Sequence, residues 1–139
     1  MKIPSNLIPI SKWSAFKGNF PPNSPKLHNI IIIYHSVDIV CYFYVTSQID
    51  NAKRVATYDI KSIAEIGSND WNELTKDSCV QCNKMHLYET TEQEIRDAYE
   101  REEIIALGHV PEIVKNKIIE ATNNSKTFTS AEKELYTLP

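Results

Sequence analysis

The sequence lacks the features that mark membrane-spanning and secreted proteins. No uninterrupted apolar stretch in the chain approaches the ~20 residues that a membrane-spanning helix needs. The three cysteines are an odd number in a chain without a signal peptide, which argues against a secreted disulfide scaffold and for reduced thiols. We therefore expect a cytoplasmic protein that does not enter a membrane.

An excess of positive charge is also missing. The 15 Lys and Arg residues are outnumbered by 18 Asp and Glu residues, which gives a net charge of −3 at pH 7. Any nucleic-acid partner must therefore be held by a local cluster of basic groups and not by the field of the whole molecule. The 139 residues, 42% of them hydrophobic, suit one compact domain with its own core, covering residues 1–139.

What the sequence does contain is a strongly apolar, β-branched region. Four isoleucines, Ile30–Ile33, are followed after the polar pair His35-Ser36 by a second apolar run that ends at Thr46. Such runs are typical of buried strands. They predict strands at 29–34 and 37–46 that form an antiparallel hairpin, with apolar side chains on both faces.

The rest of the chain divides into three parts. Residues 1–26 are rich in proline and predict an extended arm with turns at 19–24 and a short strand or helical turn at 13–16. Residues 27–90 are β-rich, with further short strands expected at 56–60, 62–66 and 78–85.

Residues 91–139 form the helical back of the chain. Helices are expected from 92 to 101, from Pro111 onward, and from 129 to about 135. Two of them start with the capping patterns Thr91–Glu94 and Thr129–Glu132. Residues 104–107 predict a short buried segment that ends at Gly108. Five or so short strands in one small domain favour a barrel or a strongly bent sheet.

Four short motifs follow one another along residues 17–122. They are Lys26–Asn29 before the isoleucines, Tyr44–Ser47, Asp77–Lys84, and Leu107–Glu112 before an amphipathic helix. In this order they resemble the MazF/PemK/Kid family of toxins. The most telling motifs are Val-Thr-Ser after the second strand and Gly-x-Val-Pro-Glu before the late helix.

The resemblance implies a fold, an activity and partners. The fold is a small SH3-like antiparallel β-barrel with peripheral helices, which is a mainly β fold of the α+β class. The activity is that of a type II toxin, an endoribonuclease that cleaves single-stranded RNA by 2′-hydroxyl attack and needs no metal or other cofactor. The expected partners are the RNA, a second copy in a homodimer, and a cognate antitoxin that threads a flexible acidic segment over the RNA groove.

One motif departs from the family pattern. Kid-type members carry Arg-Cys-Asp-Gln where this chain has Gln81-Cys82-Asn83-Lys84, so amides replace both ionisable groups. An amide can hydrogen-bond RNA, but it cannot act as a carboxylate base or a permanent cation. His28 stands where relatives commonly have a basic Arg-Pro, and imidazole exchanges protons near neutral pH.

We therefore expect His28 to act as acid or base and a cation from the loop after Ser47 to stabilise the phosphorane. The expected catalytic residues are His28, Thr46, Lys53 and Arg54. The expected RNA-binding residues are Ser47, Gln48, Gln81, Asn83, Lys84 and His86. Thr46 and Ser47 match the hydroxyl pair of the family, although hydroxyl residues also end strands by local hydrogen bonding.

Other interpretations stay open at this point. A noncatalytic RNA- or protein-binding member of the same fold is favoured by the two amides. A gyrase poison of the related CcdB type is a further alternative, but the chain ends Tyr-Thr-Leu-Pro and lacks the Trp-Gly tail of those members. Cys79 and Cys82 have the spacing of half a zinc site, and no second pair of ligands follows, so we expect no metal.

Overall fold

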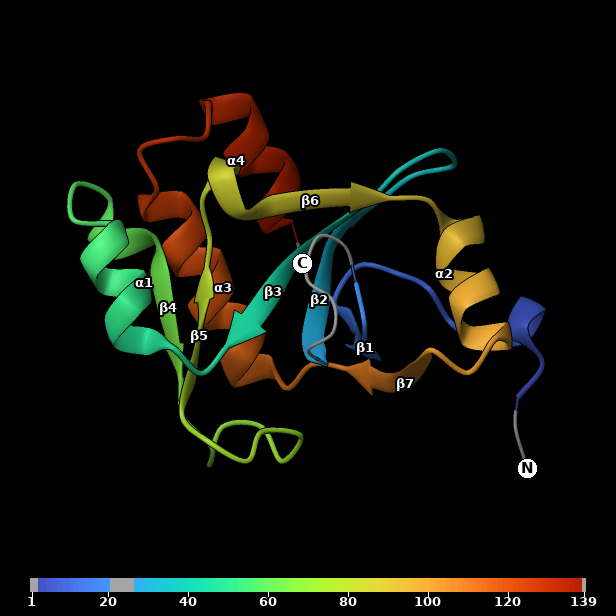
Figure 1. The fold of residues 1–139 in the computed structure, drawn as a ribbon. Helices are drawn as coiled ribbons and strands as arrows, with labels where there is room; N and C mark the ends of the chain where they lie inside the picture. Colours follow the sequence, from blue (N-terminus) through green and yellow to red (C-terminus); the bar gives the residue numbers. More distant parts are fainter. Residues whose placement is uncertain (1–2, 21–26, 139) are drawn as a thin grey trace.

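One antiparallel sheet of seven strands organises residues 3–20 and 27–138, the part of the chain that the computed structural model describes (Figure 1). The strands are β1 (Ser14–Gly18), β2 (His28–His35), β3 (Val40–Thr46), β4 (Ile63–Ile66), β5 (Ser78–Gln81), β6 (Leu87–Thr90) and β7 (Ile104–His109). The helices are α1 (Ile49–Val55), α2 (Glu92–Glu100), α3 (Glu112–Asn124) and α4 (Ser130–Thr137), and 3-10 turns lie at η1 (Ser5–Leu7), η2 (Ile60–Ser62) and η3 (Lys84–His86).

The strand order branches at β3. The main path runs β4-β5-β3-β2-β1-β7, and β6 also pairs with β3. Strand β3 thus has two successive partners along one edge, β6 beside its first half and β5 beside its last two residues. Its other edge pairs with β2. The expectation of a mainly β, α+β fold with antiparallel strands and peripheral helices is confirmed.

The predicted hairpin is present as β2 and β3. Asn29 pairs with Val45 at its open end and His35 with Val40 at its closed end. The turn is longer than the expected two residues, because the chain reverses between Ser36 and Ile39 and β3 begins only at Val40. Expected strand residue Val37 is 94% exposed in this turn.

The four isoleucines bury both faces of the sheet. Ile31 and Ile33 belong to one core cluster, which includes Val114 and Ile118 of α3. Alternate residues of a strand point to opposite faces, and Ile30 accordingly lies in the second cluster, with Ile32, N-terminal isoleucines and Ile95 of α2. Helices α3 and α4 therefore cover one face, while α2 packs near η1 and β7 (Figure 1).

Residues 3–20, the described part of the arm expected at 1–26, pack into the core instead of extending away from it. Strand β1 lies between β2 and β7 and confirms the short strand expected near 13–16. Ile8 and Ile10 are buried, because the region adds apolar side chains to the second cluster. Arg96 of α2 donates to two backbone carbonyls of this segment. Of the turns expected at 19–24, residues 21–24 lie outside the described residues.

Several predicted element boundaries are corrected. Residues 56–60 form turns and not a strand, and the strand expected at 78–85 ends at Gln81, before η3. Segment 104–107 is strand β7, in which Ile104 is buried but Ile105 is 57% exposed. The strand continues through Gly108, which adopts a positive φ of 78° beside the register shift opposite Ala15.

The two predicted capping patterns give different outcomes. Thr129 and Glu132 form the complete reciprocal box at the start of α4. Thr91 accepts from the Glu94 amide at the start of α2, while the Glu94 carboxylate accepts from the Thr90 hydroxyl instead of closing the box. None of the described helices is long and apolar enough to cross a membrane.

Gly18→Ala should lower the free energy of unfolding by about 1–3 kcal/mol, because it overpacks the contact between β1 and β7. An added Cβ would lie 2.5 Å from the Ile104 Cγ2 atom and 2.6 Å from the Glu103 carbonyl oxygen. The matched control is Gly67→Ala, whose Cβ would approach only side-chain atoms of Asp70 and Asp77, the nearest at 3.4 Å. Urea denaturation of both variants checks the prediction, and equal midpoints would contradict it.

Candidate functional site

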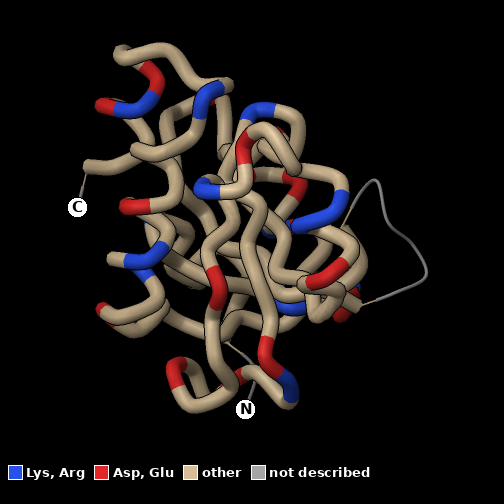
Figure 2. The backbone as a smooth tube through the Cα atoms, turned by 90° about the vertical axis from the view of Figure 1, so that its left-hand side faces the viewer, with Lys and Arg blue, Asp and Glu red and all other residues tan. Residues whose placement is uncertain are grey.

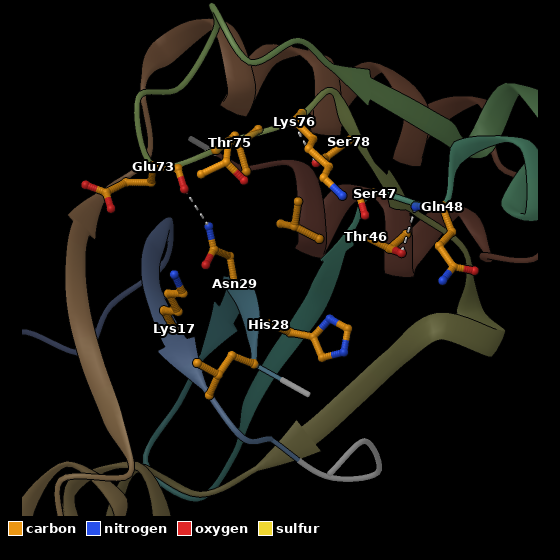
Figure 3. Close-up of a pocket in the computed structure, with 13 residues that line it drawn as sticks. Lys17, His28, Asn29, Thr46, Ser47, Gln48, Glu73, Thr75, Lys76 and Ser78 are labelled. Atoms are coloured by element: carbon orange, nitrogen blue, oxygen red, sulfur yellow. Dashed lines mark hydrogen bonds between the residues drawn. The ribbon is translucent and has the colours of Figure 1, made fainter. Parts of the chain in front are cut away.

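Two adjoining cavities lie at the rim of the sheet, where β2 starts and β3 ends. The first has a volume of about 300 Å³, and its polar lining residues are Lys17, His28, Asn29, Thr46, Ser47, Gln48, Glu73, Thr75, Lys76 and Ser78 (Figure 3). The second has about 220 Å³ and is lined by His28, Tyr44, Thr46, Gln81, His86 and Tyr88. Because His28 and Thr46 line both, we call the two cavities together the His28 groove.

Strand register brings the predicted groups into this groove. His28 is the first residue of β2 and Thr46 the last of β3, and the Asn29–Val45 pair holds these two strand ends side by side. The segment between β4 and β5 forms the opposite wall (Figure 3). It is fastened by Asn29, whose amide Nδ2 donates to the Glu73 carbonyl at 3.5 Å.

The Thr46 hydroxyl retains donor capacity, whereas the Ser78 hydroxyl donates to the Lys76 carbonyl. Thr46 Oγ1 accepts a hydrogen bond from the Gln48 backbone amide at 3.2 Å, so the local strand-ending role expected for hydroxyl residues is present. That bond uses an oxygen lone pair and leaves the Thr46 proton available for a ligand. Ser47 and Thr75 add two more hydroxyls to the first cavity.

The first cavity carries more positive than negative side chains, although the whole chain has a net charge of −3. Lysine, arginine, aspartate and glutamate positions are interspersed along the backbone (Figure 2). In the first cavity, Lys17 and Lys76 stand against one carboxylate, that of Glu73. Neither lysine forms an ion pair within the described part of the chain, so both ammonium groups can meet an anion such as phosphate.

Aromatic rings form one wall of the second cavity. The His28 ring centroid lies 5.1 Å from that of Tyr44, which in turn lies 4.8 Å from that of Tyr88. The Tyr44 hydroxyl donates to the Phe20 carbonyl, which fixes this ring. Both tyrosines are partly exposed, and such rings are surfaces on which unstacked bases of single-stranded RNA can stack.

The expected RNA-binding residues of the later strand divide between the cavity wall and the interior. Gln81 and His86 line the second cavity, whereas Asn83 is 5% exposed and lies behind the wall. Asn83 Oδ1 is 2.8 Å from His86 Nδ1. Burial lowers the pKa of His86 below its usual value, which favours the neutral imidazole.

The cations expected to stabilise the phosphorane, Lys53 and Arg54, lie outside the His28 groove. Both sit on helix α1 and not in a loop. Lys53 pairs with Glu65 of β4 at 2.9 Å, and that hydrogen bond raises the pKa of Lys53. Lys84 is likewise outside the groove and pairs with Glu132 of α4 at 3.0 Å.

The cysteines are core residues. Cys41, Cys79 and Cys82 are buried free thiols, and burial raises the pKa of Cys79 to about 11. Among the described residues, no group of three or more His, Cys, Asp or Glu side chains could hold a metal ion. Trp13 and Trp71 are also in the core.

Several residues of the groove are not predicted from the sequence: Lys17, Asn29, Tyr44, Glu73, Thr75, Lys76, Ser78 and Tyr88. The period-two alternation of β3 places Tyr44 on the same face as Tyr42 and was a usable signal. Lys17 and Lys76 have no such signal in the sequence, because their segments carry no periodic pattern. Comparison of the sequence with known protein families finds no matching family model, and comparison with curated proteins finds no match.

Proposed function

We propose that the protein is an endoribonuclease of the MazF/PemK type, which binds single-stranded RNA in the His28 groove and cleaves it through the neighbouring 2′-hydroxyl. The observation that carries the proposal is the meeting of His28, the Thr46 hydroxyl and partly exposed tyrosine rings in adjoining cavities. This arrangement supplies a proton-transfer group, a donor for phosphate oxygen and a stacking surface for bases.

The reaction needs three functions, and the groove has groups for each. His28 exchanges a proton with the attacking or the leaving oxygen. The Thr46 hydroxyl and the nearby lysines, Lys17 and Lys76, stabilise negative charge on the phosphorane. Tyr44 and Tyr88 hold a splayed base beside His28. The products of such a reaction are a 2′,3′-cyclic phosphate and a 5′-hydroxyl end.

The test is to incubate the purified protein with a long single-stranded RNA in the presence of EDTA and to map the cut ends. The proposal predicts cuts at a short recurrent sequence, each leaving a cyclic phosphate. Intact RNA, or cuts that leave a 5′-phosphate, would contradict the proposed mechanism.

A noncatalytic RNA-binding protein of the same fold is the second candidate. The observation in its favour is that amides occupy both positions of the family's ionisable pair, and that Asn83 is buried with its side chain already engaged. RNA that is bound with a measurable Kd but remains intact would select this candidate.

The proposal also includes partners and location. We propose a cytoplasmic homodimer that is neutralised by an antitoxin whose acidic segment covers the His28 groove. Lys17 and Lys76 are the cations that such a segment would meet. Light scattering of the purified protein measures the oligomeric state, and a monomer across the micromolar range would remove the homodimer from the proposal.

Lys76→Ala should weaken RNA binding and reduce the salt dependence of the affinity. Loss of one phosphate contact to a single strand reduces the magnitude of the negative slope of log K against log salt by about 0.7. The matched control is Lys126→Ala, an exposed lysine outside both cavities. Fluorescence anisotropy at several salt concentrations checks the slopes. An effect in Lys53→Ala with none in Lys76→Ala would place the phosphate at α1 instead.

A further inference from the structure

A chain of hydrogen bonds behind the second cavity fixes the proton of a second histidine. It runs from the Asp59 carbonyl through Ser62 and Asn83 to His86. The two middle residues are buried, Ser62 at 0% and Asn83 at 5% exposure. Buried polar groups normally satisfy one another with definite donor and acceptor roles, so the role of each atom can be worked out along the chain.

The first link sets the direction. Ser62 Oγ lies 2.7 Å from the Asp59 carbonyl oxygen, and a carbonyl can only accept. The single hydroxyl proton of Ser62 must therefore lie between these two oxygens. Toward Asn83, at 3.2 Å, Ser62 Oγ is left as an acceptor. The Asn83 atom that faces it is accordingly the amide nitrogen Nδ2.

The second link transfers this constraint to His86. With Nδ2 directed at Ser62, the Asn83 oxygen Oδ1 faces His86 Nδ1 at 2.8 Å. An amide oxygen accepts only, so Nδ1 of His86 carries a proton. In the neutral imidazole the other nitrogen, Nε2, then bears a lone pair. No described residue hydrogen-bonds this Nε2.

We propose that His86 is the general base of the RNA cleavage reaction, with His28 as the general acid and Asn83 as the residue that positions the His86 proton. This proposal rests on the proposed function. Both histidines line the second cavity together with Thr46. Burial lowers the pKa of His86, so its neutral, proton-accepting form prevails at neutral pH.

The proton balance of the reaction closes with these two groups. His86 Nε2 takes the proton of the 2′-hydroxyl, and the 2′-oxygen forms a bond to phosphorus. The bond from phosphorus to the 5′-oxygen breaks, and the leaving oxygen takes a proton from protonated His28. The cycle leaves His86 protonated and His28 neutral, and water restores both. A protein with amides at positions 81 and 83 thereby regains an acid–base pair from histidine side chains.

The first experiment reads the tautomer without any RNA. A ¹⁵N–¹H NMR spectrum of the full chain labelled in histidine should show His86 with Nδ1 protonated and Nε2 unprotonated above pH 7. In Asn83→Leu, which removes the acceptor, this preference should disappear, while the signals of exposed His109 on β7 stay unchanged. A wild-type His86 protonated at Nε2 would overturn the assignment.

The second experiment measures single-turnover RNA cleavage. His86→Gln should slow cleavage by about 100-fold or more, and His109→Gln should match the wild type. Asn83→Asp is nearly isosteric and places a carboxylate beside Nδ1. It should raise the pKa of His86, which moves the acidic limb of the pH–rate profile to higher pH.

The shift has one source, because the other titratable groups around His86 are unchanged in Asn83→Asp. Those sharing its cavity are His28 from β2, Tyr44 from β3 and Tyr88 from β6. Lys84, on the same turn as His86, is paired with Glu132.

The outcomes separate this inference from the proposed function. If the wild type cuts RNA and His86→Gln cuts at the same rate, the inference fails and the proposed function stands. If the wild type cuts no RNA, the proposed function fails and the catalytic role of His86 fails with it, while the NMR result still decides where the proton lies. An unmoved acidic limb in folded Asn83→Asp would also contradict the assigned positioning role.

Discussion

Replacing His28 with glutamine should lower the rate of RNA cleavage by about 10²–10⁴-fold, the usual contribution of a positioned acid or base. Glutamine keeps a polar side chain of similar length but cannot exchange a proton with the RNA. The effect should fall on the rate of the bound complex more than on RNA affinity, because the Thr46 hydroxyl and the lysines of the groove remain available to phosphate. Single-turnover kinetics at saturating protein measure this rate directly.

The control for His28→Gln is His109→Gln, which removes an exposed imidazole whose Nε2 lies 3.3 Å from the Ser11 hydroxyl, away from the groove. The circular dichroism spectra and thermal midpoints of both variants should match those of the wild type. If His28→Gln cuts RNA at the wild-type rate, His28 has no part in proton transfer.

Ile31→Ala should lower the free energy of unfolding by about 2–5 kcal/mol, through lost burial and the cavity that remains. Ile31 is fully buried in the centre of β2, paired with Ala15 of β1 and Phe43 of β3. Rigid strands on both sides prevent the site from collapsing. Domains of this size have a total stability of about 5–15 kcal/mol, so this single change removes a large share.

Urea denaturation measures the effect, with Ile105→Ala as the matched control. Ile105 is the same residue type on β7, but 57% exposed, so its replacement should change stability by less than about 0.5 kcal/mol. Equal losses in the two variants would contradict the two-sided core. His28 lies at the start of β2, and unlike Ile31 it is only partly buried. We therefore expect the folded fraction of Ile31→Ala to retain its cleavage rate.

The parts of the fold that the sequence predicts are those with strong local signals. The β-branched run of β2 and the reciprocal cap at Thr129 each specify their own structure over a few residues. Helix α1 has no such signal. Ala52 is its one buried residue, and Gln48 provides no side-chain cap. The sequence of this short charged helix is therefore typical of a loop. For that reason the sequence predicts a loop at Lys53 and Arg54, which lie on α1 instead.

The candidate site depends more on long-range pairing than on local pattern. The sequence indicates that His28 and Thr46 lie at strand ends, and the hairpin register then brings them together. Strand β6 has only four residues, none of them fully buried, and becomes a strand because β3 offers it an edge. That pairing brings Tyr88 into the groove. The tautomer of His86 depends on the hydrogen bond between Asn83 and Ser62, which lies 21 residues earlier in the chain. No local motif encodes such a contact.

We expect RNA bound in the His28 groove to be cut by its own 2′-hydroxyl. The most direct measurement uses an RNA oligonucleotide that contains the mapped cut site and a version with one 2′-deoxynucleotide on the 5′ side of that site. We expect both to bind with similar affinity, the RNA to be cut to a 2′,3′-cyclic phosphate, and the deoxy version to stay intact. Cleavage of the deoxy version at the same phosphate would contradict this expectation.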